Sequence, residues 1–155
     1  MRKLLLTTLV FGIALAARAT PARADFGIGL FLGDPTGLDL KIGLSNRSAL
    51  DLLLGFNTFR DGRSSYGHLT YLVTPVVAHG DSVLVPVRLG IGAALYGNRN
   101  DLDFAIRAPL EIALRLRRTP LEFYGEIALA LAFFNDSNND LRLDVQGGLG
   151  FRLFL

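Results

Sequence analysis

Residues 121–133 read Leu-Glu-Phe-Tyr-Gly-Glu-Ile-Ala-Leu-Ala-Leu-Ala-Phe. The odd positions carry no charge and are mostly large and apolar, whereas the even positions carry two glutamates, a tyrosine and three alanines. Successive side chains of a β-strand point to opposite faces, so this period of two predicts a strand with one apolar and one polar face. A helix requires a period near 3.6, which the segment lacks.

The same alternation continues through most of residues 25–155, interrupted by seven polar segments rich in Gly, Pro, Asn, Asp and Ser. Between residues 69 and 77 it places Leu69, Tyr71, Val73, Pro75 and Val77 on the apolar face. Such segments predict turns, and seven connections imply eight strands. Strands joined by short links pair antiparallel, and eight strands are enough to close a barrel. We therefore predict an all-β, eight-stranded, antiparallel up-and-down barrel. The predicted connections are residues 34–37, 45–48, 59–65, 79–82, 97–101, 117–120 and 135–140.

The first 24 residues have the pattern of a secretory signal peptide. Arg2 and Lys3 precede the apolar stretch Leu4–Ala17, and Ala22-Arg23-Ala24 matches a small-x-small cleavage site. A membrane anchor would need about 20 apolar residues, more than this stretch provides. We expect a cleaved signal peptide over residues 1–24 and a single barrel domain over residues 25–155.

Composition excludes several classes of function. The chain has no Cys, which removes disulfides, thiolate nucleophiles and cysteine-bound metals. Its 16 Lys and Arg against 14 Asp and Glu suggest a basic protein, but four of the basic residues lie in the predicted signal peptide. The remaining chain has no basic stripe with interleaved aromatics and no Gly-rich phosphate loop, so we expect no nucleic-acid partner and no cofactor.

The polar face of the predicted strands combines balanced charges with many glycines and alanines. The interior of an eight-stranded barrel is only wide enough for its own side chains, so it suits this face better than the leucine-rich one. The apolar face then contacts lipid, where a charge is costly, and the enclosed charges must pair. A soluble lipocalin-like barrel, with its apolar face inside, is the alternative. The predicted lumen salt-bridge network comprises Asp39, Lys41, Asp51, Arg88, Asp103, Arg107, Glu111, Arg115, Glu122, Glu126, Arg142, Asp144 and Arg152.

Connection lengths predict the orientation of a membrane barrel. With eight strands both ends of the barrel domain lie on one side, and the odd-numbered connections are on average longer than the others. Long connections face outward in outer-membrane barrels, which places the termini in the periplasm. Outward aromatics near strand ends predict an interfacial belt. They are Phe26, Phe56, Phe104, Phe123 and Phe133.

Two local motifs have a structural and a functional interpretation. Asp34-Pro35-Thr36-Gly37 is favourable for a turn, with Pro fixing φ and Gly taking positive φ, and we interpret it as a turn rather than a ligand site. His68 lies near Ser64, Ser65 and Tyr66, a set that a lipid-modifying hydrolase could use.

Three carboxylates on neighbouring predicted strands could be catalytic or could form salt bridges. Glu111, Glu122 and Glu126 could perform acid–base work, but nearby arginines favour a salt-bridge ladder. The loop at residues 135–140 has oxygen ligands without the spacing of a calcium loop, and we expect no metal site.

Three segments resemble known outer-membrane barrels. The first is Gly27-x-Gly29-x-x-x-Gly33-Asp34-Pro35-Thr36-Gly37-Leu38-x-x-Lys41, the second is Ala108-Pro109-Leu110, and the third is Gln146-x-Gly148-x-x-Phe151-x-Leu153 near the end of the chain. The chain is similar to the small eight-stranded barrels of the OmpX and OmpA transmembrane-domain type, and more closely to a family of short bacterial outer-membrane barrels with no established activity. The last segment resembles a barrel-assembly signal, although the chain ends in Leu155 rather than Phe.

The expected function follows from these points. We predict a small, non-enzymatic outer-membrane barrel with a plugged, charge-paired lumen and a structural or surface-interaction role. The expected partners are outer-membrane lipid and, during biogenesis, the barrel-assembly machinery, as the resemblance implies; no oligomeric state is indicated. The alternatives are a lipid-modifying outer-membrane enzyme and a soluble lipocalin-like binding barrel.

Overall fold

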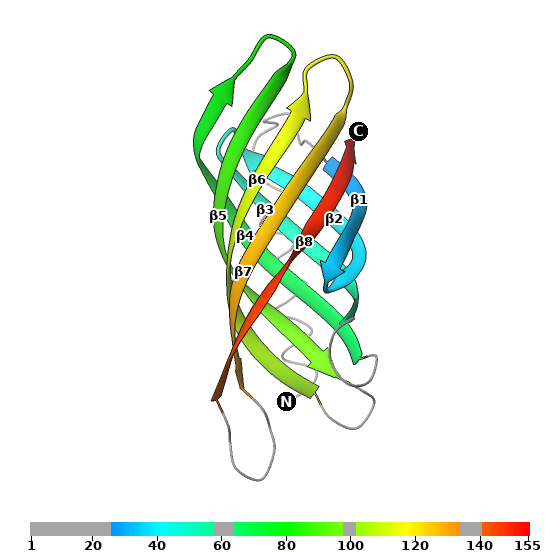
Figure 1. Ribbon diagram of the computed structural model, residues 1–155, viewed down its shortest axis with the longest axis vertical. Helices are drawn as coiled ribbons and strands as arrows, with labels where there is room; N and C mark the ends of the chain where they lie inside the picture. Colours follow the sequence, from blue (N-terminus) through cyan, green and yellow to red (C-terminus); the bar gives the residue numbers. More distant parts are fainter. Residues whose placement is uncertain (1–25, 58–63, 98–101, 134–140) are drawn as a thin grey trace.

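The computed structural model describes residues 26–57, 64–97, 102–133 and 141–155. The predicted signal peptide and most of the predicted connections at residues 59–65, 97–101 and 135–140 lie outside these ranges. The described chain folds into eight strands, each paired antiparallel with its neighbours, and β1 pairs with β8 to close the barrel (Figure 1). The strands are β1 (Phe26–Asp34), β2 (Thr36–Ser45), β3 (Ser48–Asn57), β4 (Ser64–His79), β5 (Val83–Gly97), β6 (Leu102–Leu116), β7 (Leu121–Phe133) and β8 (Leu141–Phe154).

The predicted fold class is therefore confirmed, and the predicted faces point as expected. Along β7, Leu129 is 53% exposed, whereas its neighbours Ala128 and Ala130 are fully buried. Strand register keeps like faces together, because Ala130 lies opposite Arg107 of β6 while Ile127 lies opposite Leu110. Large apolar side chains thus cover the outside and charged side chains fill the inside, the arrangement of a membrane barrel. The soluble alternative required the opposite orientation.

The predicted aromatic belt also faces outward. Phe56, Phe104, Phe123 and Phe133 are between 41% and 60% exposed, and Phe26 is half-buried. The rings of Phe104 and Phe133 stack across β6 and β7 with centroids 6.2 Å apart. The neighbouring strands β6 and β7 therefore bring these two outward aromatics together.

The alternation is broken once in β4, where the sequence pattern alone placed Val77 outward. The register of β4 against β5 shifts between Val73 and Val76. Beyond this bulge Val76 is 57% exposed, and Val77 lies opposite the buried Pro86. The extra residue exchanges the two faces for the rest of the strand, so the outward assignment of Val77 was wrong.

The first connection is a tight turn, as predicted, but Gly37 lies in the following strand rather than in the turn. Pro35, preceded by a cis peptide bond, is the single residue between β1 and β2. The Thr36 hydroxyl donates to the Gly33 carbonyl at 2.8 Å and accepts from the Gly33 amide at 3.1 Å. Gly37 does not take the predicted positive φ. It lies in β2, where a Cβ atom would be 2.4 Å from the Leu54 carbonyl oxygen of β3.

The β2–β3, β4–β5 and β6–β7 connections and the C-terminus lie at one end of the barrel, and the β4–β5 and β6–β7 hairpins extend furthest there (Figure 1). The first strand begins at the same end, because the Leu155 amide donates to the Phe26 carbonyl at 2.9 Å. We call this the short-turn end. In the described part of the chain, no helix is long and apolar enough to cross a membrane.

Candidate functional site

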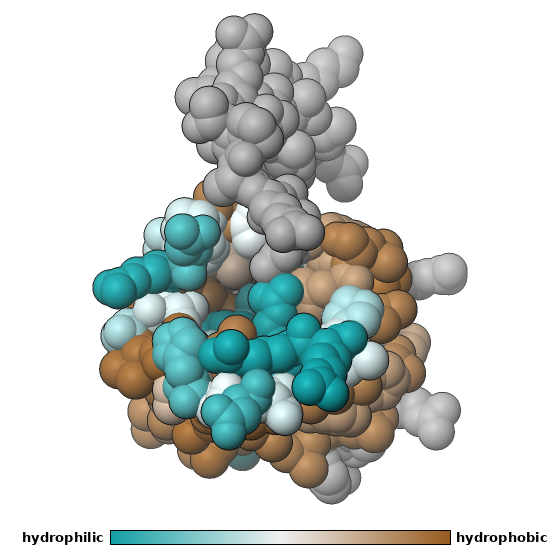
Figure 2. All heavy atoms as spheres, turned by 90° about the horizontal axis from the view of Figure 1, so that it is seen from above, coloured by the Kyte–Doolittle hydropathy of each residue, from teal (hydrophilic) through white to brown (hydrophobic). Residues whose placement is uncertain are grey.

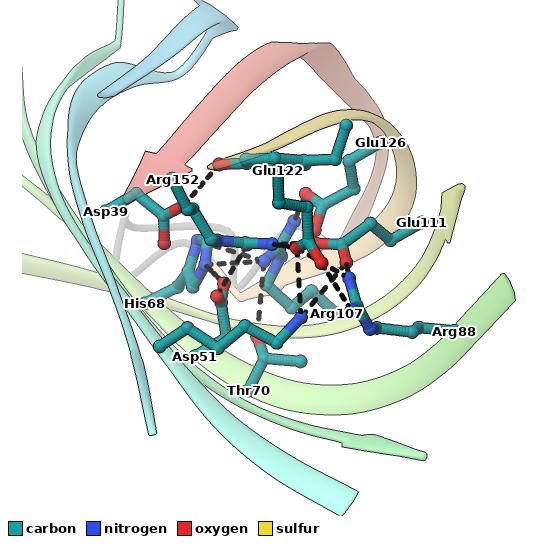
Figure 3. A network of polar contacts seen from close by, with 12 residues as sticks. Asp39, Asp51, His68, Thr70, Arg88, Arg107, Glu111, Glu122, Glu126 and Arg152 are labelled. Carbon is teal, nitrogen blue, oxygen red and sulfur yellow. Dashed lines mark hydrogen bonds and ion pairs between the residues drawn. The ribbon is translucent and has the colours of Figure 1, made fainter. Parts of the chain in front are cut away.

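The centre of the barrel contains a cluster of polar side chains from seven of its eight strands, and six of these strands contribute Lys, Arg, Asp or Glu (Figure 3). Each member lies at an inward position of its strand, between outward leucines, isoleucines or other apolar residues. Nine of the thirteen residues predicted for the lumen network are buried here with His68 and Thr70. The nine are Asp39, Lys41, Asp51, Arg88, Arg107, Glu111, Glu122, Glu126 and Arg152.

Arg152 of β8 occupies the middle of this lumen network and is fully buried. Its Nε donates to Asp39 Oδ2 at 2.5 Å, and its Nη2 donates to Asp51 Oδ1 at 2.7 Å. Its Nη1 donates to Glu111 at 2.8 Å and to Glu122 at 3.2 Å. One planar guanidinium therefore joins carboxylates from four different strands, β2, β3, β6 and β7, a geometry that a Lys ammonium lacks.

Arg88 and Lys41 share the glutamates on the side of the network nearest the short-turn end. Arg88 Nη1 donates to Glu111 Oε1, and both of its terminal nitrogens donate to Glu122, at 2.9 and 2.7 Å. Lys41 Nζ donates to Glu111 Oε1 at 3.2 Å and lies 3.8 Å from Glu122 Oε1. Both glutamates thus accept from more than one cation, which satisfies charges that burial would otherwise penalise.

Arg107 of β6 organises a second group of contacts. Its Nη2 donates to Glu126 Oε1 at 2.5 Å, and its Nη1 donates to the Thr70 hydroxyl at 3.2 Å. The same Nη1 lies 2.8 Å from Nε2 of His68, and that ring nitrogen lies 3.4 Å from Asp51 Oδ2. Asp51 thereby links the Arg107 group to Arg152, and the charged cluster is one connected network.

Glu111 and Glu126 lie directly opposite each other on β6 and β7. Like charges in this position destabilise a sheet unless cations intervene. Here Arg88 and Arg152 bind Glu111 while Arg107 binds Glu126, so the two carboxylates are directed to different partners. This contact pattern fits the predicted salt-bridge ladder rather than a shared-proton pair for acid–base work.

Aromatic side chains complete the interior, and the sequence analysis did not select them. Tyr124 donates its hydroxyl to Asp39 Oδ2, stacks on Phe31 at 5.7 Å, and lies 3.6 Å beneath the Arg152 guanidinium. Inward glycines leave room for this stack, because a Cβ atom at Gly150 would be 2.4 Å from the Tyr124 ring. The alternation of the strands places these rings at inward positions and could have identified them. Their apolar character obscured this, because an aromatic ring also suits the outward face.

A further polar group lies beside His68. Tyr66 donates its hydroxyl to Gln146 Oε1 at 3.0 Å, and Gln146 Nε2 donates to the Tyr96 hydroxyl at 2.7 Å. The Tyr66 hydroxyl is also 3.3 Å from His68 Nδ1. Among the described residues only two buried side-chain atoms lack a hydrogen-bond partner, Asp39 Oδ1 and Arg107 Nε. The lumen is therefore packed and almost fully satisfied.

Four of the predicted network residues lie outside this buried cluster. Asp103, Arg115 and Asp144 are half-buried, and Arg142 is exposed. Arg115 places its guanidinium 4.1 Å from the centre of the Phe154 ring. These four residues lie near the ends of their strands. Although they alternate with outward residues, they are therefore at the mouths of the barrel rather than at its centre.

Of the residues considered for hydrolysis, Ser65 and His68 point to opposite faces of β4. Ser65 is exposed and lies opposite Phe56 on the outward face, whereas His68 points inward and is 3% exposed. His79 is exposed near the β4–β5 connection. Within the described ranges no group of three or more His, Cys, Asp or Glu side chains is placed to hold a metal ion.

Comparison of the chain with models of protein families, with curated proteins and with solved structures gave no match. The likeness to eight-stranded outer-membrane barrels holds for strand number, antiparallel order, closure and the exposed apolar surface. Membership of a particular family remains a prediction, and the function is argued from the barrel itself.

Proposed function

We propose that this chain is a non-enzymatic outer-membrane barrel whose lumen is closed by its charge network, and that it has a structural or surface-interaction role. The observation that carries the proposal is the connected set of buried ion pairs centred on Arg152, inside a barrel with an apolar exterior. Membrane barrels without an aqueous channel have this combination of a filled interior and a lipid-compatible surface.

The outer membrane is proposed from two features taken together. The predicted signal peptide directs the chain out of the cytoplasm, and closed β-barrels are the spanning structures of outer membranes. In β8, Phe151 and Leu153 point outward while Gln146 points inward. This parity supports the resemblance of the last strand to a barrel-assembly signal, so we propose the assembly machinery as the partner during biogenesis.

Fractionation tests the location. Expressed with its signal peptide, the chain should sediment with outer membranes and migrate faster on detergent gels before boiling than after it, because a closed barrel stays compact until heated. Recovery in the soluble periplasmic fraction with unchanged mobility would contradict the proposal. A variant that should fail this test is Leu129→Arg, which places a charge on the exposed face of β7 and should reduce the amount of the heat-modifiable form.

Planar bilayers test the closed lumen. The reconstituted barrel should give no stepwise conductance, because Arg152 and its four carboxylate partners cross the interior. The charge-neutral pair Arg107→Ala with Glu126→Ala removes one contact that fills the lumen and should raise leak current while strand content by circular dichroism is retained. Regular single-channel steps from the unaltered protein would refute the closed lumen.

A further inference from the structure

A polar cavity of about 380 Å³ opens at the short-turn end of the barrel. We call it the vestibule. Its volume falls within the range of small-molecule sites, about 300 to 1,000 Å³. Figure 2 views the barrel from this end and shows hydrophilic side chains gathered inside a surround of hydrophobic ones. The polar lining includes Lys41, Ser45, Ser48, Thr74, Arg88 and Arg115.

The charges that line the vestibule are of one sign. Three cations border it, and among the described residues no carboxylate does. Glu111 and Glu122, which bind Lys41 and Arg88, are fully buried and do not belong to the lining. The cations therefore lie on the vestibule side of their carboxylate partners. An anion entering from the short-turn end meets N–H donors first.

Hydrogen-bonding capacity remains on Lys41. The Lys41 ammonium has three N–H groups, and within the described chain it makes one hydrogen bond, to Glu111. Lys41 and Arg88 are 4% and 6% exposed, so both are held in place by the surrounding strands. Arg115 is oriented at the wall by its contact with the Phe154 ring.

Thr74, a residue of the β4 bulge, also lines the vestibule. Thr74 lies where the register of β4 shifts, and its amide donates to the Arg47 carbonyl of the β2–β3 connection at 2.8 Å. Its own hydroxyl makes no hydrogen bond to another described residue. Bulges commonly redirect a side chain into a site. Ser45 and Ser48, whose hydroxyls are 2.7 Å apart, add further polar groups beside it.

From this combination we infer that the vestibule binds a small phosphate-bearing anion. Lys and Arg donors with adjacent hydroxyls are the groups that recognise phosphate oxygens, and a confined cationic cavity excludes competing water more than an open surface does. The inference goes beyond the proposed function, because a closed structural barrel needs no ligand. It also does not rest on that function, since the lining is a property of the barrel alone.

The test is calorimetric titration of inorganic phosphate into the full chain, folded in a maltoside detergent that contains no phosphate. We expect saturable binding at one site per barrel. Arg115→Gln should weaken it at least tenfold, the loss expected for one charged hydrogen bond. Thr74→Val should weaken it by a smaller factor. The matched control is Arg118→Gln, an exposed residue of the β6–β7 connection outside the lining, which should change binding less than twofold.

Each variant is first shown to be folded by heat-modifiable mobility, so that a lost site is distinguished from a lost fold. Absence of saturable binding in the unaltered chain overturns the inference, as does equal weakening by Arg115→Gln and Arg118→Gln. Repeating the titration in phosphatidylcholine nanodiscs with and without phosphatidylglycerol separates the sources of phosphate. Competition by phosphatidylglycerol assigns the site to lipid headgroups, and its absence assigns it to soluble phosphates; both outcomes support an oxyanion site.

Discussion

Replacement of Arg152 by Met should be among the most destabilising substitutions in the barrel. The guanidinium contacts four carboxylates and is fully buried. Its removal leaves three buried cations, Lys41, Arg88 and Arg107, with five buried carboxylates. Breaking one buried ion pair by deleting a partner typically costs about 3 to 5 kcal/mol. Because Arg152 serves several carboxylates, we expect a loss of free energy of unfolding at the upper end of this range.

Equilibrium unfolding in urea from lipid vesicles, followed by far-ultraviolet circular dichroism and gel mobility, measures this loss. Arg142→Met is the control, because it makes the same chemical change at an exposed position of the same strand and should cost less than about 1 kcal/mol. The double variant Arg152→Met with Asp39→Asn should recover at least about 1 kcal/mol, since it removes a carboxylate that has lost its cation. Additive effects of the two substitutions, or equal stability of the two Met variants, would refute the account.

Two other substitutions test the faces of the barrel separately. Leu129→Arg places a charge on the lipid side in the middle of β7 and should cost about 2 to 4 kcal/mol, whereas Leu129→Ala should assemble nearly normally; equal yields of heat-modifiable barrel in outer membranes would count against the outward assignment. Gly150→Ala introduces a Cβ atom 2.4 Å from the Tyr124 ring and should lower the free energy of unfolding by about 1 to 3 kcal/mol. Gly125→Ala, whose nearest contact would be the flexible end of Leu149 at 3.3 Å, should change it little, and a reversed order of the two glycine variants would contradict the packing described.

Strand parity was predictable from the sequence because a lipid-facing surface and a packed polar lumen demand opposite residue types at alternate positions. That demand located Arg107 and Glu111 on one side of β6 and Leu110 on the other. It failed where local geometry adds a residue, as in the β4 bulge that reverses Val76 and Val77. It also misjudged Gly37, because the turn motif suggested positive φ whereas close approach of β3 explains the glycine.

The partners across the lumen were not predictable in the same way. Arg152 and Asp39 are 113 positions apart, and their contact depends on how far each strand is displaced along its neighbours. Alternation contains no information on that displacement. Alternation likewise did not identify Tyr124 as a lumen residue, because the hydropathy of an aromatic ring suits either face. The hydrogen bond from its hydroxyl to Asp39 shows why it lies inside. The charged residues were therefore foreseen as a set, while their connections required the structure.

The charge network also bears on why the strands adopt one register. In a bilayer an apolar lumen would leave the two faces of each strand almost equivalent, because hydrocarbon tails are as apolar as leucine. With a charged lumen, a one-residue slip of β6 moves Arg107 and Glu111 into lipid and brings Leu110 inside. An Arg at the middle of the lipid face costs about 2 to 4 kcal/mol, and the slip further separates Glu111 from Arg88, Arg152 and Lys41. Each register displaced by an odd number of residues therefore loses on both faces at once. The network contributes to specificity even where apolar residues of similar size would give comparable stability.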